Sequence, residues 1–211
     1  MIPRERGKMS EVCVETPLHY FLDSTGAQQN TESEFAIAIC EIAAKGHLNL
    51  RGNSQDESFR AGVRNNIGLE LPTEPGTWCG DEQSSIYWLG PDEWLVIVIE
   101  GRQAVIEANL RQAISGHISV ADISSGQTLL NLSGAGVATL LKKSCGYDFD
   151  AQKFGVGRCV QTSFAKATAL AARREDGSFD LVIRRSFADY LARWMLDAGA
   201  EFGCTIYRHT G

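Results

Sequence analysis

Apolar residues recur along the chain at the three- and four-residue spacing of one helix face. The clearest stretch contains Phe187, Leu191, Trp194 and Met195 on one face, with Ser186 placed to cap its start. Three shorter stretches have the same spacing: Phe59–Val63–Ile67, Ile106–Leu110–Ala113–Ile114 and Val137–Leu140–Leu141–Ser144. An amphipathic face of this kind is typical of a helix packed on a core, so we expect four such helices.

A short apolar string occurs twice and precedes two of these helices. Leu48–Gly52 reads LNLRG and Leu130–Gly134 reads LNLSG. The helices that follow are expected to end at Gly68 and Gly146, because glycine tolerates a left-handed C-terminal cap. Each copy continues with two β-type runs around a turn, at residues 90–93 and 175–177, and then with a second helix.

The repeat predicts an α+β fold of two β-α-β-β-α halves, whose antiparallel sheets are covered by helices. We place the first half at residues 13–116 and the second at 117–211, fused as one compact unit. Residues 1–12 are expected to form a disordered N-terminal segment, and the charged first eight residues could also come from an over-extended start codon.

The two central strands of the halves differ in their patterning. In the run from Phe179 to Ile183, Asp180 interrupts the apolar residues, which predicts that one sheet face stays wet. In Trp94 to Ile99 both faces are apolar, so helices can cover one side, and the second half or another chain must cover the other. We therefore predict a partner interface around Trp78, Trp88 and Trp94, since tryptophan is favoured in interface centres.

Charge and hydropathy exclude several classes of protein. The chain has 20 Lys and Arg against 26 Asp and Glu, for a net charge of -6, and no cluster of basic residues that would bind a phosphate backbone. The first ten residues lack the apolar core of a secretory signal, and the longest apolar run, Trp94 to Ile99, is far shorter than the ~20 residues that span a bilayer. We expect a cytoplasmic protein that binds neither nucleic acid nor membrane.

Residues able to carry chemistry are scattered. The six cysteines include no C-x-x-C pair, and the four histidines have no partner at metal-ligand or triad spacing. No G-x-G-x-x-G or G-x-S-x-G string is present. Asp92 and Glu93 are neighbours in a turn and point apart, whereas Asp122 is placed either to bind a ligand or to brace the following strand. We therefore expect no catalytic, cofactor-binding or metal-binding residues in this chain.

Several strings together resemble the gamma subunit family of heterotetrameric sarcosine oxidase. The most specific are WLGPDEW at Trp88–Trp94 and RSFADYL at Arg185–Leu191; the others are PLH at 17–19, LNLRGN at 48–53, DISSGQT at 122–128 and LSG at 132–134. The resemblance implies a fold similar to the folate-binding core of aminomethyltransferase, the glycine-cleavage T-protein. It also implies assembly with alpha, beta and delta subunits that carry FAD, FMN, NAD, tetrahydrofolate and zinc, while this chain carries none of them.

The resemblance leaves three alternatives. The first is the equivalent subunit of N-methylglutamate dehydrogenase or a related demethylating complex, and the second is an adaptor without a tie to amine oxidation. The third is a free-standing folate-dependent one-carbon protein of the same superfamily. Such proteins carry an R-T-G-Y-T-G-E-x-G-[FY]-E string, of which residues 169–179 share the turn and Phe179, and Val98 and Ile99 lie where those proteins have an asparagine. Folate binding is therefore not expected.

Overall fold

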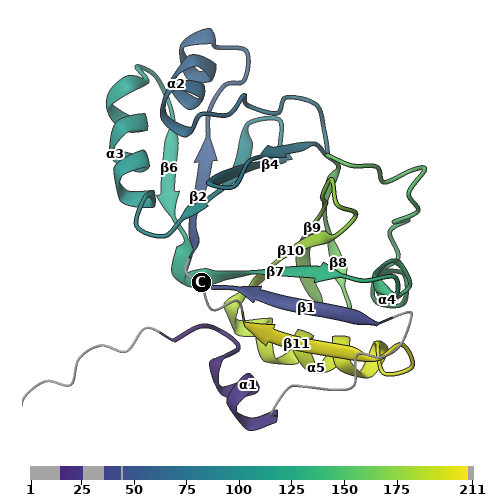
Figure 1. Cartoon of the computed structure of the whole chain (residues 1–211). Helices are drawn as coiled ribbons and strands as arrows, with labels where there is room; N and C mark the ends of the chain where they lie inside the picture. The colour runs from purple at the N-terminus through teal and green to yellow at the C-terminus, as the bar shows by residue number, and fades with distance from the viewer. Residues whose placement is uncertain (1–14, 26–35, 44, 209–211) are drawn as a thin grey trace, which may run out of the picture.

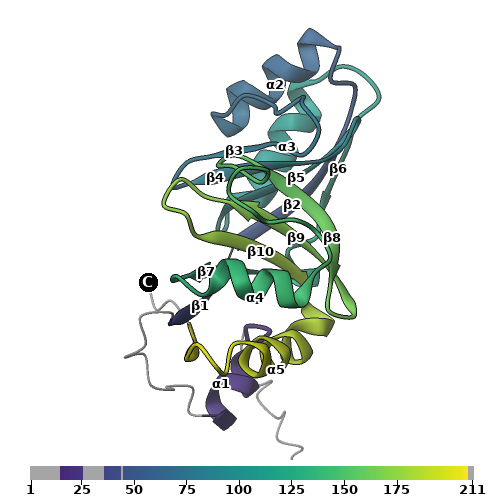
Figure 2. The same cartoon turned by 90° about the vertical axis from the view of Figure 1, so that its right-hand side faces the viewer.

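A computed structural model of the chain describes residues 15–25, 36–43 and 45–208 (Figure 1). The predicted disordered N-terminal segment, residues 1–12, lies outside the described residues. The described part forms two mainly antiparallel sheets that face each other, with helices on the outer face of each (Figure 2). This arrangement confirms the predicted α+β class with antiparallel sheets covered by helices.

The five-stranded sheet has the order β3-β4-β5-β2-β6. Its strands are β2 (Lys45–Arg51), β3 (Trp78–Gly80), β4 (Ser84–Gly90), β5 (Glu93–Ile99) and β6 (Ser119–Asp122). The helices α2 (Glu57–Ile67) and α3 (Gln103–Ala113) cover its outer face with the predicted side chains, because Phe59, Val63, Ile67, Ile106 and Leu110 are all buried.

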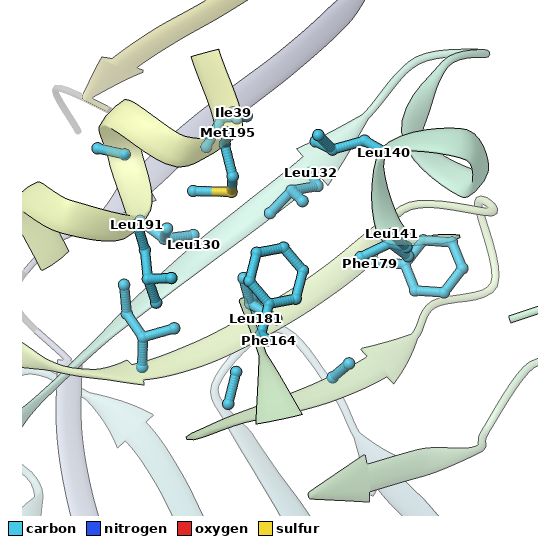
Figure 3. Close-up of a cluster of buried hydrophobic side chains, with 14 of the residues drawn as sticks. Ile39, Leu130, Leu132, Leu140, Leu141, Phe164, Phe179, Leu181, Leu191 and Met195 are labelled. Carbon is cyan, nitrogen blue, oxygen red and sulfur yellow. The ribbon is translucent and has the colours of Figure 1, made fainter. Parts of the chain in front are cut away.

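The six-stranded sheet has the order β11-β1-β7-β10-β9-β8. Its strands are β1 (Ile37–Ile42), β7 (Gln127–Ser133), β8 (Cys159–Phe164), β9 (Ala167–Arg173), β10 (Phe179–Arg184) and β11 (Cys204–Arg208). The helices α4 (Val137–Ser144) and α5 (Ala188–Ala198) cover its outer face, and α1 (His19–Thr25) packs on the same core through Phe21. Figure 3 shows Leu140 and Leu141 of α4 and Leu191 and Met195 of α5 above the leucines of β7.

Each half of the chain gives one strand to the sheet of the other half. β1 precedes the first LNL string yet pairs with β7 and β11, whereas β6 precedes the second string and pairs with β2. Each repeat also contains a strand that the sequence pattern did not reveal, β3 in the first and β8 in the second. Each predicted hairpin is therefore extended to three strands. The sequence did not predict the extra strands, because neither has the alternating pattern that marks a strand.

Close approach of other atoms explains the glycine that ends each repeated string. A Cβ atom on Gly134, which has a φ of 110°, would lie 2.0 Å from the carbonyl oxygen of Ala36 at the start of β1. A Cβ atom on Gly52 would lie 2.3 Å from the ring of Phe59 in α2. The repeated glycines thus allow the neighbouring strand and helix to pack against the string.

Two of the predicted helix boundaries differ from the structure. Ser186 does not cap the last helix, because Arg185–Phe187 forms a 3-10 turn (η2) and α5 begins at Ala188. Gly68 caps α2 in the left-handed conformation as predicted, but α4 ends at Ser144 with Cys145 in an extended conformation, so Gly146 is not its cap. A second 3-10 turn, η1 (Ser124–Gly126), joins β6 to β7.

Candidate partner interface

The inner faces of the two sheets pack against each other in a single buried layer. Leu95 and Ile97 of β5 point into it and meet the inner face of the six-stranded sheet. The other members are Tyr87, Leu129, Cys159, Leu170, Ala172 and Val182. The apolar second face of the strand from Trp94 to Ile99 is therefore covered by the second half of the chain, which was one of the two predicted covers.

A charged side chain is buried in this layer. Asp180 of β10 is 2% exposed, so the predicted wet face is wrong. Its Oδ1 accepts a hydrogen bond from Asn131 Nδ2 at 3.0 Å, and its Oδ2 accepts from Arg174 Nη1 at 2.8 Å and from the Tyr87 hydroxyl at 3.2 Å. Because Tyr87 belongs to β4 of the other sheet, the carboxylate joins the two sheets.

Burial fixes the protonation state of the tyrosine in this network. Loss of solvent, followed by the nearby charge of Asp180, raises the pKa of the Tyr87 hydroxyl well above its usual value. The hydroxyl therefore stays protonated and donates to the carboxylate at all physiological pH values. Periodicity could not reveal this network, because its members come from three strands and the β9–β10 turn. The signal in the sequence was one aspartate within an apolar strand.

The three tryptophans of the predicted interface lie on two different faces of the five-stranded sheet. Trp94 is fully buried under α2 and α3, where its indole N–H donates to the carbonyl of Pro72 at 2.8 Å. Trp88 is its cross-strand neighbour and is half-buried against the same core. Trp78 pairs with Tyr87, and its side chain lies on the inner face. Trp78 and Trp88 thus cannot contribute to one flat contact.

Trp78 is held at the open end of the inter-sheet layer. Its ring stacks on Tyr87 at a centroid distance of 5.3 Å, and its indole N–H donates to the carbonyl of Arg173 at 3.1 Å. The guanidinium of Arg174 lies 5.8 Å from the Trp78 ring centroid, within cation–π distance. A half-buried indole is therefore fixed in position by contacts from both sheets.

A groove of about 490 Å³ begins at this tryptophan, and we call it the Trp78 groove. Its apolar surface comes from Trp78, Cys79 and Val156, and the valine, which precedes β8, is 55% exposed. Val156 was not among the predicted interface residues, because a single valine in a glycine-rich loop gives no pattern. Figure 2 shows the β3–β4 end of one sheet and the β9–β10 turn of the other on the same side of the molecule.

Carboxylates from those two turns line the rim of the Trp78 groove. Arg174 also lines it, but this guanidinium already binds the buried Asp180. Asp81 and Asp176 accept hydrogen bonds from backbone N–H groups of their own turns. Neither Glu82 nor Glu175 forms an ion pair with any residue that the structure describes. The groove therefore combines an apolar floor with a negative rim.

A second cavity, of about 330 Å³, lies between the sheets next to this groove. Aliphatic side chains reach it from β5 as predicted, with Ile97 and Val98 among its lining. Polar groups also converge here, which the sequence interpretation did not foresee, since Asn131 and Asp180 line the same cavity. The Asp180 carboxylate already accepts from Asn131 Nδ2 and Arg174 Nη1, and Asn131 Nδ2 also donates to Ser178 Oγ.

Three of the thiols and one imidazole are shifted away from nucleophilic or acid–base chemistry. Burial raises the pKa of Cys79 and Cys204 to about 11 and that of Cys159 to about 12, so these thiols stay protonated. Burial also lowers the pKa of His47, whose Nδ1 lies 3.1 Å from Gln127 Oε1. Asp122 binds Ser124 and so stabilises the turn before β7.

Among residues 15–25, 36–43 and 45–208, no three His, Cys, Asp or Glu side chains are grouped so as to hold a metal ion. No helix in the same ranges is long and apolar enough to cross a membrane.

Comparison with known proteins gives one consistent family. Residues 51–201 match the profile of the "Sarcosine oxidase, gamma subunit family". The chain is 32% identical over 168 residues to the sarcosine oxidase subunit gamma of Corynebacterium sp. (strain P-1), which covers 79% of this chain and 81% of that protein. It is 31% identical over 169 residues to the subunit gamma from Arthrobacter sp., with coverage of 79% and 82%.

Solved structures show the same relationship. A chain of the heterotetrameric sarcosine oxidase from Corynebacterium sp. U-96 superposes with a TM-score of 0.81 and 29% identity, covering 90% of this chain and 96% of that one. The glycine cleavage system aminomethyltransferase T from Bartonella henselae superposes with a TM-score of 0.62 and 14% identity, covering 91% of this chain and 58% of that one. The second match supports the shared fold alone and confirms the predicted likeness to aminomethyltransferase.

Proposed function

The chain belongs to the sarcosine oxidase gamma subunit family, and from that premise we propose that it is a non-catalytic structural subunit of a sarcosine-oxidase-type complex. The observation that carries this proposal is the superposition on 96% of a chain from a heterotetrameric sarcosine oxidase. The local chemistry agrees with it, because the thiols with raised pKa are protonated and the buried Asp180 is occupied by three hydrogen-bond donors.

We place the chain in a cytoplasmic heterotetramer with alpha, beta and delta subunits. In this proposal the other subunits carry FAD, FMN, NAD, tetrahydrofolate and zinc, oxidatively demethylate sarcosine and pass the one-carbon unit to tetrahydrofolate. The gamma chain contributes surface and stability to the assembly. The names of the curated relatives favour sarcosine as the substrate over N-methylglutamate.

Co-expression tests this proposal. A tagged copy of the chain, produced with the other oxidase subunits of its source organism, should co-purify with them as a yellow complex that oxidises sarcosine faster than N-methylglutamate. The same chain purified alone should be colourless and should not oxidise sarcosine. A flavin spectrum that stays with the lone chain through gel filtration would contradict the non-catalytic role, and preferential oxidation of N-methylglutamate would support the sister complex instead.

A further inference from the structure

The Trp78 groove has the composition of a docking site rather than of a small-molecule pocket. Its floor exposes apolar surface from Trp78 and Val156, the valine being 55% exposed, and its position between two turns leaves it open to solvent along one side. A partly exposed tryptophan that is already fixed by stacking on Tyr87 loses little conformational freedom when a partner covers it. The floor therefore favours an apolar side chain of another protein as its occupant.

The rim determines which apolar segment fits. Four carboxylates line the groove: Asp81, Glu82, Glu175 and Asp176. Arg174 also lines the groove, but its guanidinium pairs with the buried Asp180 carboxylate at 2.8 Å. Its positive charge therefore mainly neutralises Asp180 and leaves the rim negative. Glu82 and Glu175 are exposed and form no ion pair within the described ranges. A partner that brings Lys or Arg to the rim would neutralise these charges, whereas an acidic partner would be repelled.

We propose that the Trp78 groove binds a segment of a partner oxidase subunit in which an apolar side chain is flanked by Lys or Arg. The apolar side chain occupies the floor beside Trp78 and Val156, and the cation lies between Glu82 and Glu175. This inference rests on the proposed function, since it identifies which surface of the subunit meets its partners and the chemistry of the segment that is bound.

The floor is tested by a single substitution with a matched control. Val156→Arg fills the groove and brings a positive charge toward a basic partner, so it should abolish recovery of the chain with the co-expressed oxidase subunits. Val105→Arg alters a valine on α3 that is 61% exposed and lies outside the groove, and recovery should be unchanged. Equal recovery of both variants would overturn the docking site. Melting temperatures of the lone chains establish that both variants are folded.

The rim is tested by charge reversal. Glu82→Lys combined with Glu175→Lys should weaken assembly at least about tenfold at low ionic strength, and the difference should shrink at high salt because exposed charges are screened. The control pair, Asp92→Lys with Asp197→Lys, reverses two exposed carboxylates outside the groove and should have no such effect. Unchanged assembly of the rim variant, or a loss that does not depend on salt, would overturn the basic character of the partner segment.

Photo-cross-linking identifies the segment itself. With p-benzoylphenylalanine in place of Val156, the complex should yield a cross-link to a partner peptide that carries Lys or Arg beside an apolar residue, and the same group in place of Val105 should not label that peptide. A cross-link to an acidic peptide, or no difference between the two positions, would contradict the proposal. If the unmodified chain does not assemble with the oxidase subunits at all, the proposed function fails, and the groove is not the cause.

Discussion

The two sheets repeat one arrangement of strands, but equivalent rows of residues across them differ in chemistry. The repeated strings make Asn49 equivalent to Asn131, and from each asparagine the strand register defines one row. In the five-stranded sheet the row is Asn49–Leu95–Tyr87–Trp78, and in the six-stranded sheet it is Asn131–Asp180–Ala172–Cys159. One row is thus bulky and contains two aromatic side chains, and the other is small and carries a carboxylate.

The difference shows how two copies of one unit can pack face to face. Side chains from both rows meet in the inter-sheet layer, where Tyr87 lies in the same buried cluster as Ala172 and donates to Asp180. Two identical aromatic rows would compete for the same volume, because protein interiors are close-packed. Large side chains instead face small ones, and a hydroxyl donor faces an acceptor. The arrangement also fixes Trp78 at the end of the layer, where the groove begins.

The largest effect is expected when the difference between the rows is removed. Leu95→Asp puts a carboxylate at the position equivalent to Asp180, in a side chain that is 2% exposed. The substitution loses the buried leucine and puts a second carboxylate in the inter-sheet layer, where Arg174 already pairs with Asp180. The free energy of unfolding should therefore fall by more than about 4 kcal/mol. Urea denaturation followed by far-UV circular dichroism measures the change. Leu95→Met, of similar volume, should cost less than about 1.5 kcal/mol; equal losses would contradict this explanation.

The second effect comes from removal of the carboxylate itself. Asp180→Ala removes the carboxylate acceptor of the Tyr87 hydroxyl and leaves the Asn131 amide with Ser178 Oγ. It also frees Arg174, whose side chain is 39% exposed and can reach water. We expect a loss of about 3 kcal/mol, at the lower end of the range for broken buried pairs because one partner is partly solvated. Thermal and urea unfolding measure it. The control Asp92→Ala, in an exposed turn, should change stability by less than about 0.5 kcal/mol.

The smallest effect isolates the single bond between the two rows. Tyr87→Phe keeps the ring that stacks on Trp78 and removes the hydroxyl that donates to Asp180. Because Arg174 and Asn131 still bind the carboxylate, the free energy of unfolding should fall by about 1 to 2 kcal/mol. The double variant Tyr87→Phe with Asp180→Ala should lose less stability than the sum of the losses of the two single variants. Full additivity in this cycle would show that the hydroxyl and the carboxylate do not interact.

Much of the fold was predictable because it depends on local spacing. The helix faces with Phe59, Val63 and Ile67 and with Leu140 and Leu141 are buried as the 3.6-residue period predicted. The turn at residues 90–93 and the strands on either side also follow the pattern. The pattern failed for β3, which has only three residues, and for β8, where the polar residues Gln161, Thr162 and Ser163 follow one another. These segments are strands because they pair with their neighbours, and their sequences show no strand periodicity.

The candidate interface was predictable only in part. Tryptophan content pointed to one hairpin region, but Trp94 is fully buried in the chain's own core, and Trp88 faces the helices. Trp78 lies beside the groove because of its pairing with Tyr87, and register of this kind is not visible in a list of residue types. Val156 and the carboxylates of the β9–β10 turn line the same groove as Asp81 and Glu82, although they lie more than about 70 residues further along the chain.

Residue identity and spacing within single segments are enough to reveal the repeat, its helix faces, the two-sided apolar character of Trp94 to Ile99 and the likeness to the sarcosine oxidase gamma family. The three-dimensional fold fixed which strand each half gives to the other sheet, and it buried Asp180 among hydrogen-bond partners. It also decided that the two turns and Trp78 form one groove. These features depend on contacts between segments that are distant in the chain. Many folds are compatible with the same local pattern, and close packing together with satisfied hydrogen bonds favours one of them.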